Sequence, residues 1–184
     1  MSTENIIIRP AKIEDVDAIA EIYNQGVDGG ISTFDDFYVS VNRYKAYFDL
    51  NRKKSSLLVA VLENNIVGWA SIDPISERNA YRFTSLGSVY VRNEFKGQQI
   101  GRLLKIAKLK DAVRLDYHSM ICEILSTNHI SVSLNLSLGF RIVGEISEAG
   151  YRNNNWIGLI VMQKFLKLHI TEHSVPVHSI FVYQ

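Results

Sequence analysis

The sequence predicts a single mixed α/β domain built on one central sheet flanked by helices. Short β-branched or alternating segments indicate strands, and segments with apolar residues three and four positions apart indicate helices. They follow one another as a strand, two helices, three strands, a helix, a strand, a helix and two strands. With 184 residues, 47% of them hydrophobic, the chain can bury a core of its own. We assign the domain to residues 1–166 and treat residues 167–184 as a C-terminal extension of unknown role, whose apolar run Ser179–Tyr183 could add an edge strand, contact a second subunit or fray.

The first expected elements are a strand and an amphipathic helix. A β-branched run from Asn5 to Arg9, closed by Pro10, predicts the strand. Apolar residues on one face of Ile13–Tyr23, with acids in the first turn and Gly26 beyond the end, predict the helix. The segment Asp28–Tyr38 is rich in Gly, Asp and aromatic residues and favours a loop. The later elements are expected at residues 41–50 (helix), 57–62 and 66–72 (a β-hairpin), 86–91 (strand), 101–116 (helix) and 120–125 (strand). Residues 126–129 supply N-cap residues for a short helix that ends at Gly139. The last strands are expected at residues 140–146 and 156–165, separated by a loop at residues 150–155.

The helix expected at residues 101–116 has both apolar and basic residues at helical spacing. Its apolar residues should pack against the sheet, and its basic residues should remain in water. The residues expected to face inward are Leu103, Leu104, Ala107 and Val113. The residues expected near or across the solvent side are Arg102, Lys105, Lys108 and Lys110.

Composition and charge exclude several classes of protein. The 20 basic and 19 acidic residues give a net charge of +1, so no overall field attracts nucleic acid or an anionic membrane, and any anion site must be local. The lone cysteine, Cys122, excludes an internal disulfide and a multi-cysteine zinc site, and we expect it as a small apolar residue in a strand. The N-terminus lacks a signal-peptide pattern, and no run approaches the ~20 apolar residues of a membrane span. We therefore expect a cytoplasmic protein that binds no metal.

The stretch from Gly87 to Leu109 carries the strongest functional signal. An alternating strand ends at Val91, a polar turn with Gly97 and Gly101 follows, and a basic helical pattern comes next. The first amide N–H groups of a helix lack partners and lie at the positive end of the helix dipole. Such a loop is suited to hold phosphate, although an ordinary strand-to-helix connection could contain the same glycines.

This stretch resembles the coenzyme A pyrophosphate loop of the GCN5-related N-acetyltransferases. That loop has Gln or Arg, two residues, Gly, one residue, and then Gly or Ala. Here Lys96 stands in place of the Gln or Arg, Gln99 stands in place of the first Gly, and Gly101 is retained as the last residue of the pattern. Other motifs resemble the phosphinothricin-type N-acetyltransferases of the superfamily: Arg78-Asn79-Ala80-Tyr81, Ser88-Val89-Tyr90-Val91, Asn128 and Ser131 before Gly139-Phe140, and Tyr151 before Trp156. The resemblance covers Ile6 to about Leu166 and implies that fold, with transfer of an acetyl group from acetyl-CoA to the amine of a small molecule or amino acid.

The resemblance also implies which residues hold acetyl-CoA. The amides of Val89 and Val91 should pair with the pantetheine arm and polarise the thioester carbonyl. The loop amides should hold the pyrophosphate together with Lys96 and Arg102, and Asn128 should lie near the pantetheine. The full set expected to bind coenzyme A is Val89, Tyr90, Val91, Lys96, Gly97, Gln98, Gln99, Ile100, Gly101, Arg102, Asn128 and Ser131.

Acyl transfer to an amine needs a base for the ammonium and an acid for the leaving thiolate. Phosphinothricin-type enzymes carry a Glu where this chain has Leu86. They also carry a His near the thiol, at a position where the wider superfamily often has Tyr and this chain has Asn135. Asn135 can hydrogen-bond there but is a poor acid. Glu123 is the candidate base, because ribosomal-protein alanine acetyltransferases have a Glu at this offset and an apolar strand would desolvate its carboxylate. A Glu on an exposed strand face is the alternative interpretation, and His118 and His129 are alternative bases.

Four aromatic residues are candidates to bind the amine acceptor: Phe34, Tyr81, Tyr151 and Trp156. Phe37 and Tyr38 lie in the same loop as Phe34 and could also line the acceptor site. Core packing is the alternative for the aromatic residues of this loop. The sequence does not identify the acceptor, and a homodimer is compatible with the resemblance because such enzymes often form dimers.

Two other functions remain open at this point. The replacements at Leu86, Gln99 and Asn135 are compatible with a non-catalytic acyl-CoA sensor or assembly module. Leu86 and Gln99 could instead reshape the cleft for a different acyl donor. The basic residues are dispersed and lack interleaved aromatic residues, so nothing in the sequence indicates nucleic-acid binding.

Overall fold

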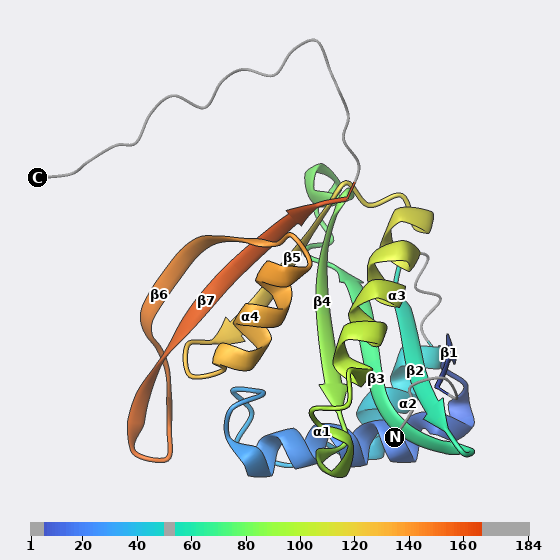
Figure 1. The fold of residues 1–184 in the computed structure, drawn as a ribbon. Helices are drawn as coiled ribbons and strands as arrows, with labels where there is room; N and C mark the ends of the chain where they lie inside the picture. Colours follow the sequence, from blue (N-terminus) through green and yellow to red (C-terminus); the bar gives the residue numbers. More distant parts are fainter. Residues whose placement is uncertain (1–5, 50–53, 167–184) are drawn as a thin grey trace, which may run out of the picture.

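The computed structural model describes residues 6–49 and 54–166, which form one mixed sheet with helices packed on it (Figure 1). In these residues the strand order is β1-β2-β3-β4-β5-β7-β6. The strands are β1 (Ile7–Pro10), β2 (Ser56–Leu62), β3 (Asn65–Pro74), β4 (Thr84–Val91), β5 (Ser119–Leu125), β6 (Arg141–Arg152) and β7 (Asn155–Phe165). The α-helices are α1 (Val16–Gly29), α2 (Val41–Asp49), α3 (Ile100–Arg114) and α4 (His129–Ser137). The predicted order of strands and helices is confirmed.

The centre of the sheet opens where β4 meets β5. These two strands are parallel, whereas the other neighbouring strands are antiparallel. They pair only from Thr84 with Ser119 to Leu86 with Ile121, and beyond that point each strand continues without the other. Figure 1 shows β4 and β5 meeting near the top of the view and spreading apart below. One edge of β4 is therefore left without a strand partner from Gly87 onward, because its other edge pairs with β3.

Different helices cover the two faces of the sheet. The helices α1 and α2 pack on the face that carries Val59 and Trp69. The helix α3 packs on the opposite face, where its residues Ile100 and Leu104 contact the neighbourhood of Ala60. Residues of α3 and α4 also share a core with β5 and β7, which includes Cys122 at 3% exposure. Cys122 is thus the small buried strand residue that the sequence predicts.

Two predicted boundaries are wrong. The helix α1 continues through Gly26 to Gly29 and ends at Gly30, whose φ of 70° is left-handed. Gly26 does not end the helix. It lies where other side chains pack closely against α1, because a Cβ added there would lie 3.3 Å from Ser32 and 3.4 Å from the Tyr90 ring. The strands β6 and β7 run through the predicted loop at residues 150–155 and join at Asn153 and Asn154, both with positive φ.

The predicted faces of α3 are also wrong in part. Lys105 and Lys108 are 6% and 1% exposed instead of facing water, whereas Val113, expected inside, is 39% exposed. Lys110 is exposed as predicted. The helix has apolar residues all around its circumference and is covered by the sheet on one side and α4 on another, so periodicity did not define its buried face.

Some expectations concern membranes, metals or the chain ends. In residues 6–49 and 54–166, no helix is long and apolar enough to cross a bilayer. The same residues contain no group of three or more His, Cys, Asp or Glu side chains that could hold a metal ion. The predicted strand-like run Ser179–Tyr183 lies outside the residues that the structure describes.

Candidate functional site

A pocket of about 420 Å³ occupies the opening between β4 and β5. Its walls come from β4, β5, the loop before α3, the first turns of α3 and α4, and the C-terminal half of α1 with the segment after it. It therefore reaches both helix-covered faces of the sheet. Eleven of the residues expected to bind coenzyme A line it: Val89, Tyr90, Val91, Lys96, Gly97, Gln99, Ile100, Gly101, Arg102, Asn128 and Ser131. Gln98 does not line it, because its side-chain amide donates to the Glu94 carbonyl at 3.3 Å.

The loop before α3 presents main-chain donors to this pocket. The Leu103 amide donates to the Gln99 carbonyl at 3.0 Å, so the amides of residues 100–102 precede the first helical hydrogen bond. Gly97 has a φ of 80° and Gln99 a φ of 64°, which turns the backbone sharply into the helix. A Cβ added to Gly101 would lie 3.6 Å from Val91. Free amides at a helix N-terminus beside Lys96 and Arg102 suit a diphosphate, so these residues fit the pyrophosphate of coenzyme A.

Asn128 organises the far wall of the pocket. It is the N-cap of α4, and its side-chain oxygen accepts from the Ser131 amide at 3.1 Å. This contact is the predicted capping role of the segment before the helix. Both residues line the pocket where α4 begins.

Glu123 lines the pocket but is not desolvated. It is exposed, so the expectation that an apolar strand buries its carboxylate is wrong. The reason is strand alternation: its neighbour Cys122 packs under α3 and α4, so Glu123 points to the other face. That face carries α1, whose residues Ile22 and Gly26 line the same pocket. His118 and His129, the alternative bases, do not line it.

Asn135 is not at the pocket surface. Its side chain is 0% exposed and lies on the buried side of α4, outside the pocket wall. Its Oδ1 accepts from Lys105 Nζ at 2.9 Å, and its Nδ2 donates to the Ser131 carbonyl at 2.8 Å. The prediction that Asn135 meets the reacting thiol is therefore wrong, because both ends of its amide are engaged inside the protein.

The structure places two buried lysines beside the pocket, which the sequence reasoning missed. Lys105 lines the pocket together with Gly87 and Cys122. Burial, and to a lesser extent the charge of Lys108, lowers the pKa of Lys105 to about 7. Lys108 is completely enclosed, and burial also lowers its pKa. Among the described residues, Lys108 Nζ has no hydrogen-bond partner.

The two predicted acceptor segments, the loop after α1 and the β6–β7 hairpin, contact each other, and the first of them lines the pocket. A Cβ added to Gly150 would lie 2.6 Å from the Phe34 ring, so the loop after α1 touches the β6–β7 hairpin. The buried Arg152 strengthens this contact by donating to the carbonyls of Thr33, at 3.0 Å, and Val27. Ile31 and Ser32 of this loop line the pocket.

The candidate aromatic residues themselves are not all at the pocket. Tyr151 and Trp156 are partners across the β6–β7 hairpin, with ring centroids 5.0 Å apart, and both are exposed. Tyr81 lies in a short 3-10 helix before β4 and is 46% exposed. Phe37 and Tyr38 are 80% and 67% exposed, so core packing is excluded for both. None of the four candidate residues, Phe34, Tyr81, Tyr151 and Trp156, lines the pocket wall, and their contact with an acceptor stays a prediction.

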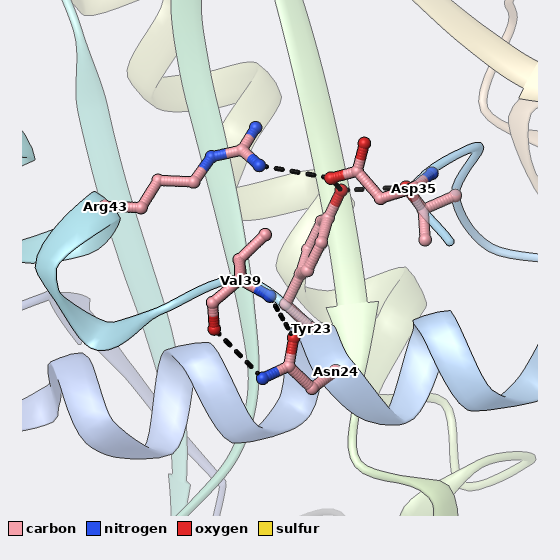
Figure 2. A network of polar contacts seen from close by, with 6 residues as sticks. Tyr23, Asn24, Asp35, Val39 and Arg43 are labelled. Atoms are coloured by element: carbon pink, nitrogen blue, oxygen red, sulfur yellow. Dashed lines mark hydrogen bonds and ion pairs between the residues drawn. The ribbon is translucent and has the colours of Figure 1, made fainter. Parts of the chain in front are cut away.

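A polar network holds the loop after α1 in place (Figure 2). The Tyr23 hydroxyl donates to Asp35 at 2.6 Å, and Arg43 of α2 donates to the same carboxylate oxygen at 3.1 Å. The Asn24 side chain exchanges two hydrogen bonds with the main chain of Val39, at 2.9 and 3.1 Å. The loop after α1 is therefore fixed on α1 and α2 at Asp35 and Val39.

Known proteins share this architecture. The model of the acetyltransferase (GNAT) family matches residues 20–140. An L-methionine sulfoximine/L-methionine sulfone acetyltransferase of Salmonella typhimurium is 31% identical over 92% of this chain and 97% of its own. The structure of yncA, an acetyltransferase from Salmonella typhimurium solved with its cofactor acetyl-CoA, has a TM-score of 0.86 at 28% identity and covers 93% of this chain and 99% of its own. A phosphinothricin acetyltransferase from Sinorhizobium meliloti, solved with acetyl-CoA, has a TM-score of 0.83 at 26% identity over 88% of each chain. This chain therefore belongs to the acetyltransferase (GNAT) family.

Proposed function

We propose that this protein transfers the acetyl group of acetyl-CoA to the primary amine of a small, amino-acid-like molecule. The observation that carries the proposal is the pocket between β4 and β5, which joins an anion-binding helix N-terminus to a carboxylate on the opposite face of the sheet. The named acceptors of the similar enzymes are amino acids or their analogues, which favours an α-amino group as the nucleophile.

The free edge of β4 supplies the donors for the thioester arm. From Gly87 to Val91 this edge has no neighbouring strand, so its peptide groups can pair with the amides of pantetheine. We assign the amides of Val89 and Val91 to that arm and to the thioester carbonyl. A fixed N–H directed at the carbonyl oxygen stabilises the negative charge that develops there during attack.

Glu123 is the proposed base. The acceptor enters from the face that carries α1, where Glu123 lines the pocket and can take a proton from the substrate ammonium. Leu86, at the position of the Glu in phosphinothricin-type enzymes, forms the last β4–β5 pair and cannot serve. Glu123, two residues beyond the Leu86–Ile121 pair on β5, is thus proposed to replace a residue at the closed end of the opening.

The test combines binding with turnover. Calorimetry should detect coenzyme A binding to the wild type, and a thiol-release assay should detect transfer to L-methionine sulfoximine, L-methionine sulfone or phosphinothricin. Glu123→Gln should lower kcat at pH near neutrality by about 100-fold or more while leaving coenzyme A affinity unchanged. Glu63→Gln, in the exposed turn of the β2–β3 hairpin, is the matched control and should behave as wild type.

Each outcome has a distinct meaning. Failure to bind coenzyme A would refute the assignment of the pocket. Binding without transfer to any amine in a broad panel would favour the acyl-CoA sensor or assembly module. Unchanged turnover in Glu123→Gln would remove Glu123 as the base while the activity itself stands.

Two properties remain predictions beside this function. A homodimer is expected from the resemblance, and size-exclusion chromatography with light scattering tests it. A cytoplasmic location is expected from the single cysteine, and fractionation of cells that express the protein tests it.

A further inference from the structure

Lys105 is held at a fixed point of the pocket wall. Its side chain is 6% exposed, and its Nζ donates to Asn135 Oδ1 at 2.9 Å. Asn135 is itself immobilised, because its Nδ2 donates to the Ser131 carbonyl within α4. A lysine normally extends into water, but this one is bent inward between α3 and α4 and still borders the pocket.

The packing of α3 on β4 shows which part of the pocket Lys105 borders. At the start of α3, Gly101 lies against Val91, the last residue of β4. Two turns further along α3, Lys108 Nζ lies 2.7 Å from the position that a Cβ on Gly87 would occupy, and Gly87 directly follows the last β4–β5 pair. Lys105 lies on α3 between Gly101 and Lys108. It therefore faces the stretch between the phosphate-binding loop and the closed end, where the thioester arm must run.

The surroundings of Lys105 make its proton exchangeable near neutral pH. The titratable groups that act on it are Lys108 of the same helix, which lowers its pKa, and Cys122 of β5, which raises it. From α4 it meets the neutral amide of Asn135, and Glu123 points away to the other face of β5. Burial dominates, and the resulting pKa of about 7 lets both protonation states exist at physiological pH.

We propose that Lys105 is the proton donor to the departing sulfur of coenzyme A, working across the sheet opening from Glu123. This inference rests on the proposed acetyl transfer. The amine nitrogen attacks the thioester carbonyl carbon, a carbon–nitrogen bond forms, and the carbon–sulfur bond breaks with its electron pair on sulfur. The substrate ammonium first loses one proton through Glu123 to water, so that the neutral amine attacks. Lys105 then gives its ammonium proton to the sulfur, and Glu123 receives the second proton, which the nitrogen loses as the amide forms. Proton transfer at nitrogen and at sulfur thus takes place on opposite faces of the sheet.

Lys108 has a supporting role in this proposal. It is three residues from Lys105 on the buried side of α3 and does not line the pocket. Because a like charge disfavours a second one, Lys108 keeps the pKa of Lys105 low. Lys108 is therefore a positioning residue that acts only through Lys105.

The first test follows kcat/KM for acetyl-CoA against pH. The wild type should lose activity as the pH rises through the pKa of Lys105, because only the protonated amine can donate. Lys105→Met should lower the maximum about 100-fold and abolish this high-pH decline. Lys108→Met should keep the decline and move it to higher pH. Lys110→Met, an exposed lysine of the same helix, is the control and should match the wild type.

The second test needs no turnover. The ultraviolet absorbance of the thiolate reports the ionisation of coenzyme A bound to the protein. An ammonium beside the sulfur lowers the pKa of the thiol, so the thiolate should appear at lower pH in the wild-type complex than in the Lys105→Met complex. Calorimetry on the same samples should show coenzyme A affinity within about threefold, since Lys105 is assigned to the sulfur and not to the phosphates.

Lys105→Gln separates proton donation from packing. Its amide can still donate to Asn135 Oδ1, but it has no proton to give. If Lys105 only holds α3 against α4, Lys105→Gln will keep the turnover, the high-pH decline and the thiol pKa of the wild type, and the proposal is overturned. If the wild type binds coenzyme A but acetylates no amine, the proposed function fails, while the thiolate spectra still decide whether Lys105 faces the sulfur.

Discussion

Replacing the buried Lys108 by methionine should stabilise this protein. Lys108 is 1% exposed, and in the described part of the chain its Nζ meets no hydrogen-bond partner. A Cβ added to Gly87 would lie 2.7 Å from the Lys108 Nζ and 3.1 Å from the sulfur of Met120. Methionine has a similar length and shape, so Lys108→Met removes the amine and keeps the contacts of the side-chain carbons.

The size of the effect follows from the lost hydration of the amine. A buried polar group without a partner costs about 1–3 kcal/mol in protein mutational data, and Lys108→Met should raise the free energy of unfolding by about that amount. For a chain of this size each kcal/mol corresponds to about 2–4 °C in Tm. The gain should also depend on pH, because burial lowers the folded-state pKa of Lys108 below its ordinary value of 10.5.

The sign of the pH dependence can be stated in advance. Between the lowered folded-state pKa and 10.5, the unfolded chain binds more protons at Lys108 than the folded chain does. The stability of the wild type therefore rises with pH across this range, and Lys108→Met lacks that contribution. The stabilisation by the mutation should be largest at low pH and shrink as the pH approaches 10.5.

Urea unfolding followed by circular dichroism measures these differences. Titrations of wild type, Lys108→Met and Lys110→Met at about pH 7 and about pH 10 give the increase in the free energy of unfolding and its change with pH. The exposed Lys110 should change stability by no more than about 0.5 kcal/mol. A loss of stability in Lys108→Met, with the pH slope of the wild type retained, would show that the buried amine has a favourable partner and that the reasoning is wrong.

Three further mutations test other parts of the structure. Gln99→Gly should hold or raise Tm, because Gln99 has a φ of 64° that costs a side chain about 1–2 kcal/mol, whereas Gln98→Gly should lower it. Asp15→Asn should lower the free energy of unfolding by about 1–3 kcal/mol at neutral pH, because it weakens the 2.6 Å ion pair with Arg9. Arg9 lowers the pKa of Asp15 below 3.8, so urea titrations at decreasing pH should show wild type and variant converging as the pH falls through that lowered pKa. Arg152→Met should cost about 1–3 kcal/mol in urea titrations by removing its hydrogen bonds to the carbonyls of Thr33 and Val27. It should also raise KM for the acceptor more than for acetyl-CoA, and equal effects on both would contradict the prediction that this contact borders the acceptor site.

Local patterns account for what the sequence predicted well. The order of strands and helices, the hairpin between β2 and β3, and the cap at Asn128 depend on neighbours a few residues apart, where backbone hydrogen bonding and side-chain period decide the outcome. The loop before α3 belongs to the same class, because a strand, a turn with glycine and a helix start define its free amides without any distant contact. Eleven of the twelve residues that the family resemblance implies for coenzyme A line one pocket.

Contacts between distant segments account for the errors. The burial of Lys105 depends on α4 closing over α3, and the engaged amide of Asn135 depends on Lys105, thirty residues earlier. The exposure of Glu123 depends on which face of β5 the helices cover. In each case the local sequence was compatible with either orientation, and packing chose one.

The amino-acid order by itself therefore determined the order of strands and helices and the loop of free amides before α3, because these follow from short-range geometry. Only the tertiary structure decided which charged groups border the pocket, because burial is a property of facing elements. When a helix has apolar residues all around its circumference, its sequence does not indicate which side will be buried. Packing of α3 between the sheet and α4 buries Lys105 and Lys108.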